Sequence, residues 1–245
     1  MRTLKVFLPL VTAIFLYFNS SAQTDLAIAI NGSGSIDATE FQLQKDAISN
    51  CVANFPRDGS VGFTLIQYAA NTTTVHVPYM TITAGTDIAA IQASISAINQ
   101  ISGLTNSGDG IIAAANEILN NGTAGFNKVV VLATDGSTSS GTDFSTAVST
   151  IQAAGINDFG VIAIDVMSVL TFYSPFVFGN GTAEFAATFT EFTDVLEQYC
   201  ETVVGPAITT SAIPTMGEWG LISLGLLFMI IGAISVRQKA ASVSF

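Results

Sequence analysis

The stretch Leu26 to Phe41 reads LAIAINGSGSIDATEF and decides the fold class of this chain. Its first five residues form an apolar run, which indicates a buried strand. A loop of small residues then leads into a predicted helix from about Ala38 to Asn54. Phe41, Ile48 and Val52 fall on one face of that helix. A buried strand, a small-residue loop and a helix in succession are the opening unit of an α/β sheet.

The same alternation continues along the chain. Further strands are predicted at Val61 to Tyr68, Thr73 to Val77, Lys128 to Ala133 and Phe159 to Ile164, with an edge strand at Ala183 to Phe189. Further helices are predicted at Thr86 to Asn99, Gly108 to Leu119, Phe144 to Ala154 and Phe192 to Val203. The run KVVVLA at Lys128 to Ala133 is typical of a central parallel strand. The sequence therefore predicts an α/β fold, a doubly wound and mainly parallel sheet with helices on both faces.

The N-terminus resembles a secretory signal. Arg2 and Lys5 precede an apolar core from Val6 to Phe18, and small residues follow up to Ala22. We expect residues 1–22 to be a signal peptide cleaved after Ala22. The alternative is a retained membrane anchor, but the apolar run is shorter than the ~20 residues that a span needs.

The C-terminus carries a second hydrophobic signal. Residues 213–220 read IPTMGEWG, residues 221–236 are apolar, and Arg237 and Lys239 follow. A Trp at one edge and cations at the other predict a transmembrane helix at 221–236 whose basic end stays in the cytoplasm. Residues 213–245 also resemble the IPTL-type C-terminal sorting signals of bacterial surface proteins, in which the tail is removed by an exosortase-type enzyme. This implies a protein that is secreted or held at the cell surface or outer envelope of a bacterium, bound to the membrane before processing. A plain single-pass anchor is the alternative.

Charge and cysteine content narrow the class of protein further. Between the two ends, three basic and seventeen acidic residues remain, a net charge of about −14, which excludes a nucleic-acid binder. Such a surface serves solubility or attracts cations and basic partners. Cys51 and Cys200 are the only cysteines. In an oxidising compartment they form either one disulfide that closes a long loop or two buried thiols.

Three small-residue loops stand at or near predicted strand ends, where open parallel sheets bind ligands. They are Asn31-Gly32-Ser33-Gly34-Ser35, Gly103-Leu104-Thr105 and Thr134-Asp135-Gly136. The first loop fails the dinucleotide fingerprint because Asp37 stands where a small residue is required, and the chain has no GxxxxGK motif. No Gly-x-Ser-x-Gly elbow is present, and the only histidine, His76, falls in an exposed or edge strand. Hydroxyl and carboxylate oxygens instead suit a hard divalent cation, Mg²⁺ first, with Mn²⁺ or Ca²⁺ as alternatives.

These loops resemble the metal-ion-dependent adhesion site of the von Willebrand factor type A domains. That site is Asp-x-Ser-x-Ser after the first strand, a Thr in a later loop and Thr-Asp-Gly after the fourth strand. The resemblance covers residues 23–204 and leaves 205–212 as a linker. It implies that Ser33, Ser35 and Thr105 bind the cation through hydroxyls, and that Asn31 and Asp135 hold it mainly through waters. A carboxylate of the partner would complete the coordination.

Position 31 departs from the family pattern, since Asn replaces Asp and leaves one formal carboxylate. We expect a weakened cation site, or alternatively a metal-free site that is only structural. Asp109 either restores charge nearby or occupies a helix start, which the helix dipole favours.

The family resemblance also has consequences for the cysteines and for function. It places the first and last helices side by side, which predicts a disulfide between Cys51 and Cys200. It implies a non-enzymatic module that binds a protein or matrix partner, with adhesion as its role. The rival prediction is a structural or assembly subunit of the envelope or matrix with a degenerate site.

Overall fold

The computed structural model describes residues 23–205, and its centre is a six-stranded sheet in the order β3-β2-β1-β4-β5-β6. The strands are β1 (Thr24–Asn31), β2 (Asp58–Ala69), β3 (Thr72–Thr83), β4 (Asn127–Thr134), β5 (Asp158–Ile164) and β6 (Ala183–Ala186). All neighbouring pairs run parallel except β2 and β3, which are antiparallel. The predicted fold class is confirmed.

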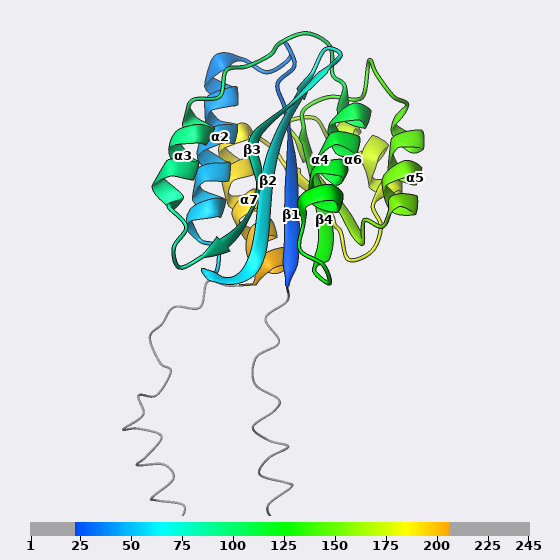
Figure 1. The fold of residues 1–245 in the computed structure, drawn as a ribbon. Helices are drawn as coiled ribbons and strands as arrows, with labels where there is room; N and C mark the ends of the chain where they lie inside the picture. Colours follow the sequence, from blue (N-terminus) through cyan, green and yellow to red (C-terminus); the bar gives the residue numbers. More distant parts are fainter. Residues whose placement is uncertain (1–22, 206–245) are drawn as a thin grey trace, which may run out of the picture. The chain divides into compact units, whose positions relative to one another are not determined.

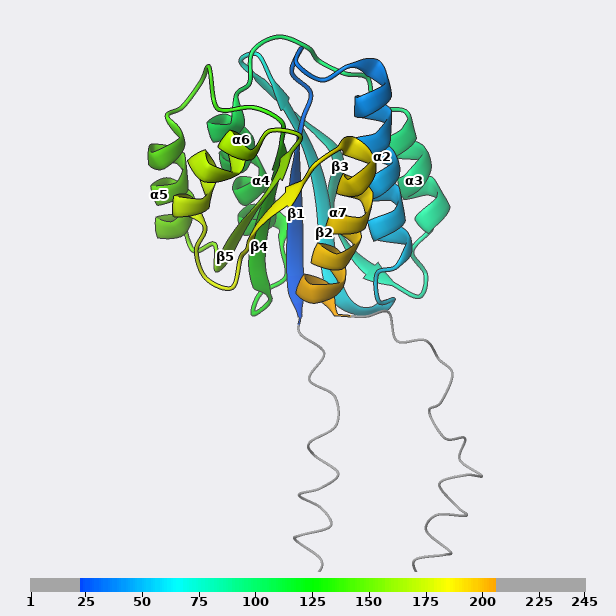
Figure 2. The same cartoon turned by 180° about the vertical axis from the view of Figure 1, so that it is seen from behind.

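Helices cover both faces of this sheet. They are α2 (Ala38–Ala53), α3 (Ile88–Ser96), α4 (Ser107–Asn121), α5 (Phe144–Ala154), α6 (Met167–Tyr173), the 3-10 turn η1 (Ser174–Phe176) and α7 (Phe189–Val204). Figures 1 and 2 show α2, α3 and α7 on one face and α4, α5 and α6 on the other. The two helical layers enclose two separate hydrophobic clusters, one on each side of the sheet.

Strand β1 lies at the centre because both of its faces are buried. Leu26, Ile28 and Ile30 belong to the cluster under α2 and α7, whereas Ala27 and Ala29 belong to the cluster under α4. The small alanines leave room for α4, which packs closely against β1 and β2. Each face of β1 therefore has side chains of the size that its covering helices require.

Several boundaries differ from those that periodicity predicted. Strand β3 continues to Thr83 rather than Val77, because β2 pairs with it along nearly its whole length. Helix α3 is shorter than expected at both ends. Asp87 caps the start of α3 by accepting from the N–H of Ala90. At the other end of α3, Lys45 Nζ donates to the carbonyls of Ser96 and Ile98. Helix α6 had no counterpart in the prediction, since its seven residues are too short for a periodic signal.

The predicted signal peptide at 1–22, the sorting signal at 213–245 and its membrane helix at 221–236 lie outside the described residues, as does all of the linker beyond Gly205. Of the helices that the structure does describe, none has the length and apolar character of a membrane span. Thr24 at the start of β1 donates to the carbonyl of Val203 near the end of α7. The described segment thus begins and ends at the amino-terminal edge of the parallel strands.

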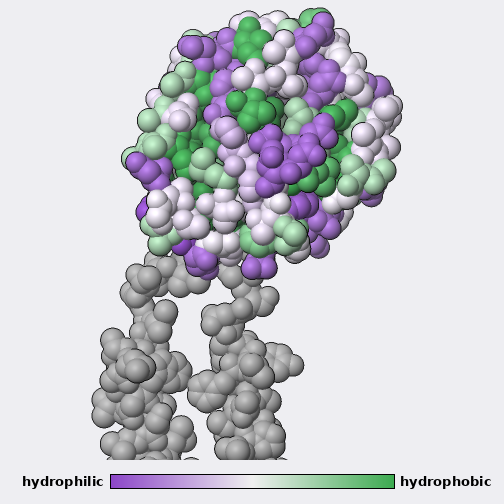
Figure 3. All heavy atoms as spheres, viewed as in Figure 1, coloured by the Kyte–Doolittle hydropathy of each residue, from purple (hydrophilic) through white to green (hydrophobic). Residues whose placement is uncertain are grey.

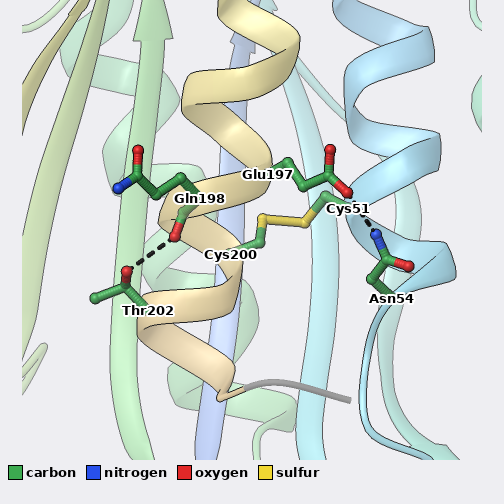
Figure 4. The surroundings of a disulfide bond; sticks show 6 residues. All are labelled: Cys51, Asn54, Glu197, Gln198, Cys200 and Thr202. Carbon is green, nitrogen blue, oxygen red and sulfur yellow. Dashed lines mark hydrogen bonds between the residues drawn. A yellow bond between two sulfur atoms is a disulfide. The ribbon is translucent and has the colours of Figure 1, made fainter. Parts of the chain in front are cut away.

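The predicted disulfide is confirmed. Cys51 of α2 and Cys200 of α7 are bonded, their Cα atoms lie 6.1 Å apart, and both residues are buried. Figure 4 shows the bond between the two helices, with Asn54 Nδ2 donating to Glu197 Oε1 at 2.8 Å beside it. The disulfide and this hydrogen bond join the first and last helices of the described domain across 149 residues of chain.

Removal of this cross-link should destabilise the domain. Because the closed loop is long, the chain-entropy model predicts that the double variant Cys51→Ser, Cys200→Ser loses about 5 kcal/mol of unfolding free energy. Urea unfolding of the natural and double-variant proteins measures this loss. An unchanged urea midpoint, or two titratable thiols in the denatured and unreduced natural protein, would contradict the assignment.

Candidate functional site at the carboxyl ends of β1 and β4

The ends of two neighbouring parallel strands bring the first two predicted site residues together. Asn31 is the last residue of β1, and Asp135 follows the last residue of β4. Asn31 Nδ2 donates to Asp135 Oδ1 at 2.6 Å, while Asn31 Oδ1 accepts from the backbone N–H of Ser33 at 2.9 Å. These two hydrogen bonds fix the orientation of the Asn31 amide, because the reverse orientation would place oxygen against carboxylate and nitrogen against N–H.

The three predicted hydroxyl groups meet beside this pair. Ser33 Oγ and Ser35 Oγ lie 2.9 Å apart, and Thr105 Oγ1 donates to Ser33 Oγ at 3.3 Å. Ser33 and Thr105 are buried, whereas Ser35 is exposed. All five residues singled out in the sequence therefore lie in one cluster, with Ser35 on its solvent side.

Backbone and amide hydrogen bonds connect the first two loops. Ser102 N–H donates to Gly32 O at 2.7 Å, and Gly34 N–H donates to Gly103 O at 2.9 Å. The side chain of Gln100 donates to the carbonyls of Ser33 and Ile36. Ser102 has φ +64°, a left-handed conformation that is costly for a residue other than glycine. The loop before Thr105 therefore holds a strained conformation against the loop of Ser33 and Ser35.

Two tyrosine hydroxyl groups hold the third loop, Thr134-Asp135-Gly136, in place. Tyr68 OH donates to Ala133 O at 3.0 Å, and Tyr173 OH donates to Gly136 O at 3.1 Å. Burial raises the pKa of both tyrosines. They remain neutral hydrogen-bond donors at neutral pH. Ser139 Oγ accepts from Thr105 N–H at 3.0 Å and so connects this loop to the second one.

The N-terminus of α2 is not open to a phosphate group. Asp37 Oδ1 accepts from the N–H groups of Thr39 and Glu40, and the carboxylate of Glu40 accepts from the Asp37 N–H. This capping box satisfies the free helix donors that an anion would otherwise use.

Asp109 occupies a helix start and does not join the cluster. It lies in the first turn of α4 and accepts from Asn106 Nδ2 and from Thr142 N–H. Burial acts to raise the pKa of Asp109, but the hydrogen bonds from Thr142 and Asn106 outweigh it and lower the pKa. Its carboxylate is therefore committed to holding the loop before α5.

The oxygen donors of the cluster fit a hard divalent cation, but the site carries less negative charge than one with two carboxylates. Within residues 23–205, no group of three or more Asp, Glu, His or Cys side chains is placed to hold a metal ion, so any cation here depends on hydroxyls. The cluster offers three hydroxyl oxygens and the Asp135 carboxylate, while the Asn31 amide nitrogen occupies one of the Asp135 oxygens. Oxygen donors of this kind suit Mg²⁺, Mn²⁺ or Ca²⁺. One carboxylate attracts such an ion less strongly than two would.

Comparison with known proteins identifies the family. The family model of the von Willebrand factor type A domain matches residues 25–170, which is more than half of the chain. The chain therefore belongs to the von Willebrand factor type A domain family. Human integrin alpha-E is 28% identical over 145 residues, which are 57% of this chain and 12% of the integrin subunit.

Solved structures show the same fold. Proximal thread matrix protein 1 of the mussel byssus, in the form with a zinc-occupied MIDAS motif, matches with a TM-score of 0.60 and 20% identity over 74% of this chain and 46% of that one. The pilus adhesin SpaC of Lactobacillus rhamnosus GG, in its open conformation, matches with a TM-score of 0.62 and 12% identity over 76% and 30%. The chain thus spans less than half the length of each of these relatives, whose names are those of adhesion or matrix proteins.

The supporting residues were not identified from the sequence. Gln67, Gln100, Ser139 and Tyr173 position the loops through hydrogen bonds from four different segments. Only Gln67 carried a signal, as a polar residue in the apolar β2 run, and it is fully buried.

Substitution of Asn31 by Asp should make stability depend on a cation. In Asn31→Asp two carboxylates would meet where Asn31 now donates to Asp135, which costs about 1 to 3 kcal/mol without an ion to bridge them. We expect the melting temperature of the variant to rise with millimolar Mg²⁺ and to fall with EDTA, whereas that of the natural protein changes little.

Asn71→Asp is the matched control, since Asn71 is exposed in the β2–β3 turn. Equal melting temperatures of Asn31→Asp in EDTA and in Mg²⁺ would contradict this account.

Proposed function

We propose that this chain is an extracellular binding module that attaches to a protein or matrix partner through the carboxyl edge of its sheet. The carrying observation is the convergence of Asn31, Ser33, Ser35, Thr105 and Asp135 from three loops, in the order of the family's adhesion site. Membership in the family and the adhesion and matrix relatives support this role.

In this proposal the site binds a divalent cation weakly. Ser33, Ser35, Thr105 and Asp135 would hold it, Mg²⁺ being the first candidate, and the cation would supply a positive centre for a carboxylate of the partner. Asn31 donates to Asp135 and so satisfies one oxygen of its carboxylate in the absence of an ion. The domain is thereby satisfied without metal, and the cation adds binding capacity rather than stability.

The placement of the site supports a surface role. The loops lie at the carboxyl edge of β1 and β4, while the described chain begins and ends at the opposite edge of these parallel strands. We propose no catalysis, because the one histidine, His76, is bonded to the Gln67 amide rather than to a nucleophile.

A direct test is calorimetric titration of Mg²⁺, Mn²⁺ and Ca²⁺ into the purified chain. We expect millimolar binding in the natural protein, loss of binding in Asp135→Ala and binding at least tenfold tighter in Asn31→Asp. The acidic peptide Ac-Gly-Asp-Gly-NH₂ should then perturb the loop resonances only when cation is present, and Ac-Gly-Asn-Gly-NH₂ should not.

The rival function is that of a structural or assembly subunit with a metal-free site. It predicts no heat of binding in the natural protein, no effect of EDTA on assembly, and cation binding only after Asn31→Asp. The two proposals therefore differ in the titration of the natural protein.

A further inference from the structure

The only histidine of the chain stands next to a buried amide that reaches the binding loops. His76 lies on edge strand β3, is half-buried, and borders a shallow groove of about 280 Å³ between β3 and α3. On the face where β3 and α3 lie, hydrophobic and hydrophilic side chains are mixed (Figure 3). Gln67 of β2, which is fully buried, lies between this histidine and the loop that follows α3.

The Gln67 amide satisfies its surroundings in one orientation only. Its nitrogen then donates to His76 Nε2 at 2.9 Å and to the Asn99 carbonyl at 3.1 Å, and its oxygen accepts from the Ile101 N–H at 3.2 Å. In the reverse orientation, oxygen would face the Asn99 carbonyl and nitrogen would face the Ile101 N–H. The favoured arrangement requires a neutral His76 whose Nε2 carries no proton.

Gln67 also touches the first loop of the candidate site. A Cβ atom added at Gly32 would collide with the end of the Gln67 amide, which is its oxygen in the favoured orientation, so the amide packs directly against the Gly32 backbone. Ile101 immediately precedes Ser102, the residue in the left-handed conformation that donates to Gly32 O. The bonds to Asn99 and Ile101 therefore hold the segment whose strain would be released if they were lost.

From this geometry we infer that His76 and Gln67 form a pH-sensitive latch that keeps the loop leading to Thr105 in place only while His76 is neutral. A protonated Nε2–H would confront the Gln67 NH₂ group. If the amide turned to accept from His76, it would lose its bonds to both Asn99 and Ile101. Either outcome loosens the segment 99–105, to which the loop of Ser33 and Ser35 is bonded, so acid weakens binding at the carboxyl edge.

The charged groups around β3 are engaged in other hydrogen bonds, so His76 is the group whose titration acts on Gln67. Asp87 of α3 shares the groove but caps its own helix, and Lys45 of α2 bonds to Ser96 O and Ile98 O. On the other face of the sheet, Glu117 of α4 accepts from the Tyr79 N–H. Burial lowers the pKa of His76 below its ordinary value. The unfolded chain therefore takes up the proton first, and stability is lost as pH falls below about 6.5.

Hydrogen exchange of the full chain in EDTA tests the latch without any cation or partner. After correction for intrinsic exchange, we expect protection of the Ile101 amide to fall at least fivefold between pH 7.5 and pH 5. The variant His76→Gln keeps an oxygen acceptor but does not titrate, so its protection should not change with pH. Gln67→Met should lower protection at every pH.

Two results would overturn the latch. One is protection at Ile101 that does not change with pH in the natural protein, and the other is an equal fall in His76→Gln. Should His76→Gln not fold, the His76 ring resonances of the natural protein decide the question. They must titrate below the ordinary histidine pKa and share a midpoint with the Ile101 amide, and separate midpoints would refute the coupling. Because no cation takes part, failure of the latch leaves the proposed cation site standing, and the reverse also holds.

Discussion

The hydrogen bond from Asn31 to Asp135 determines how the three loops at the carboxyl edge of the sheet are held together. It joins the ends of β1 and β4, the two central parallel strands. A carboxylate at position 31 would need an ion to bridge it to Asp135, whereas the Asn31 amide donates a proton to Asp135 directly. The Asn31 oxygen is engaged as well, by the Ser33 N–H, so the amide is held at both ends. The three loops are consequently held together by hydrogen bonds of this chain alone, and in our proposal a cation would add charge for recognition rather than cohesion.

The support for these loops comes from groups that differ in their response to pH. Tyr68 and Tyr173 are neutral donors over the whole neutral range because burial raises the pKa of each. Gln67, in contrast, depends on the protonation state of His76, a partly buried side chain on the edge strand. The tyrosine contacts to the loop of Asp135 are therefore insensitive to pH, whereas the Gln67 contact to the loop leading to Thr105 is sensitive. The disulfide between α2 and α7 lies apart from both.

Much of this could be predicted from the sequence. The apolar runs of β1 and β4 predicted the parallel sheet, and small polar residues at the strand ends marked the three loops. The family resemblance then assigned the five residues of the cluster. The pairing of Cys51 with Cys200 followed only from the family resemblance, because spacing alone left free thiols open. The direction of the Asn31 amide could not be foreseen, since it depends on the Ser33 N–H and the Asp135 carboxylate meeting in space. Gln67, Gln100 and Tyr173 escaped notice for the same reason, and α6 because one short turn has no periodicity.

The most direct test of the account is anomalous diffraction from crystals of the natural protein grown in a high concentration of Mn²⁺. We expect a partly occupied manganese peak within coordination reach of Ser33, Ser35, Thr105 and Asp135, with the Asn31 amide still turned towards Asp135. A fully occupied site that displaces the Asn31 hydrogen bond would contradict the view that this bond weakens the site. The absence of any peak between the three loops would contradict the cation site itself.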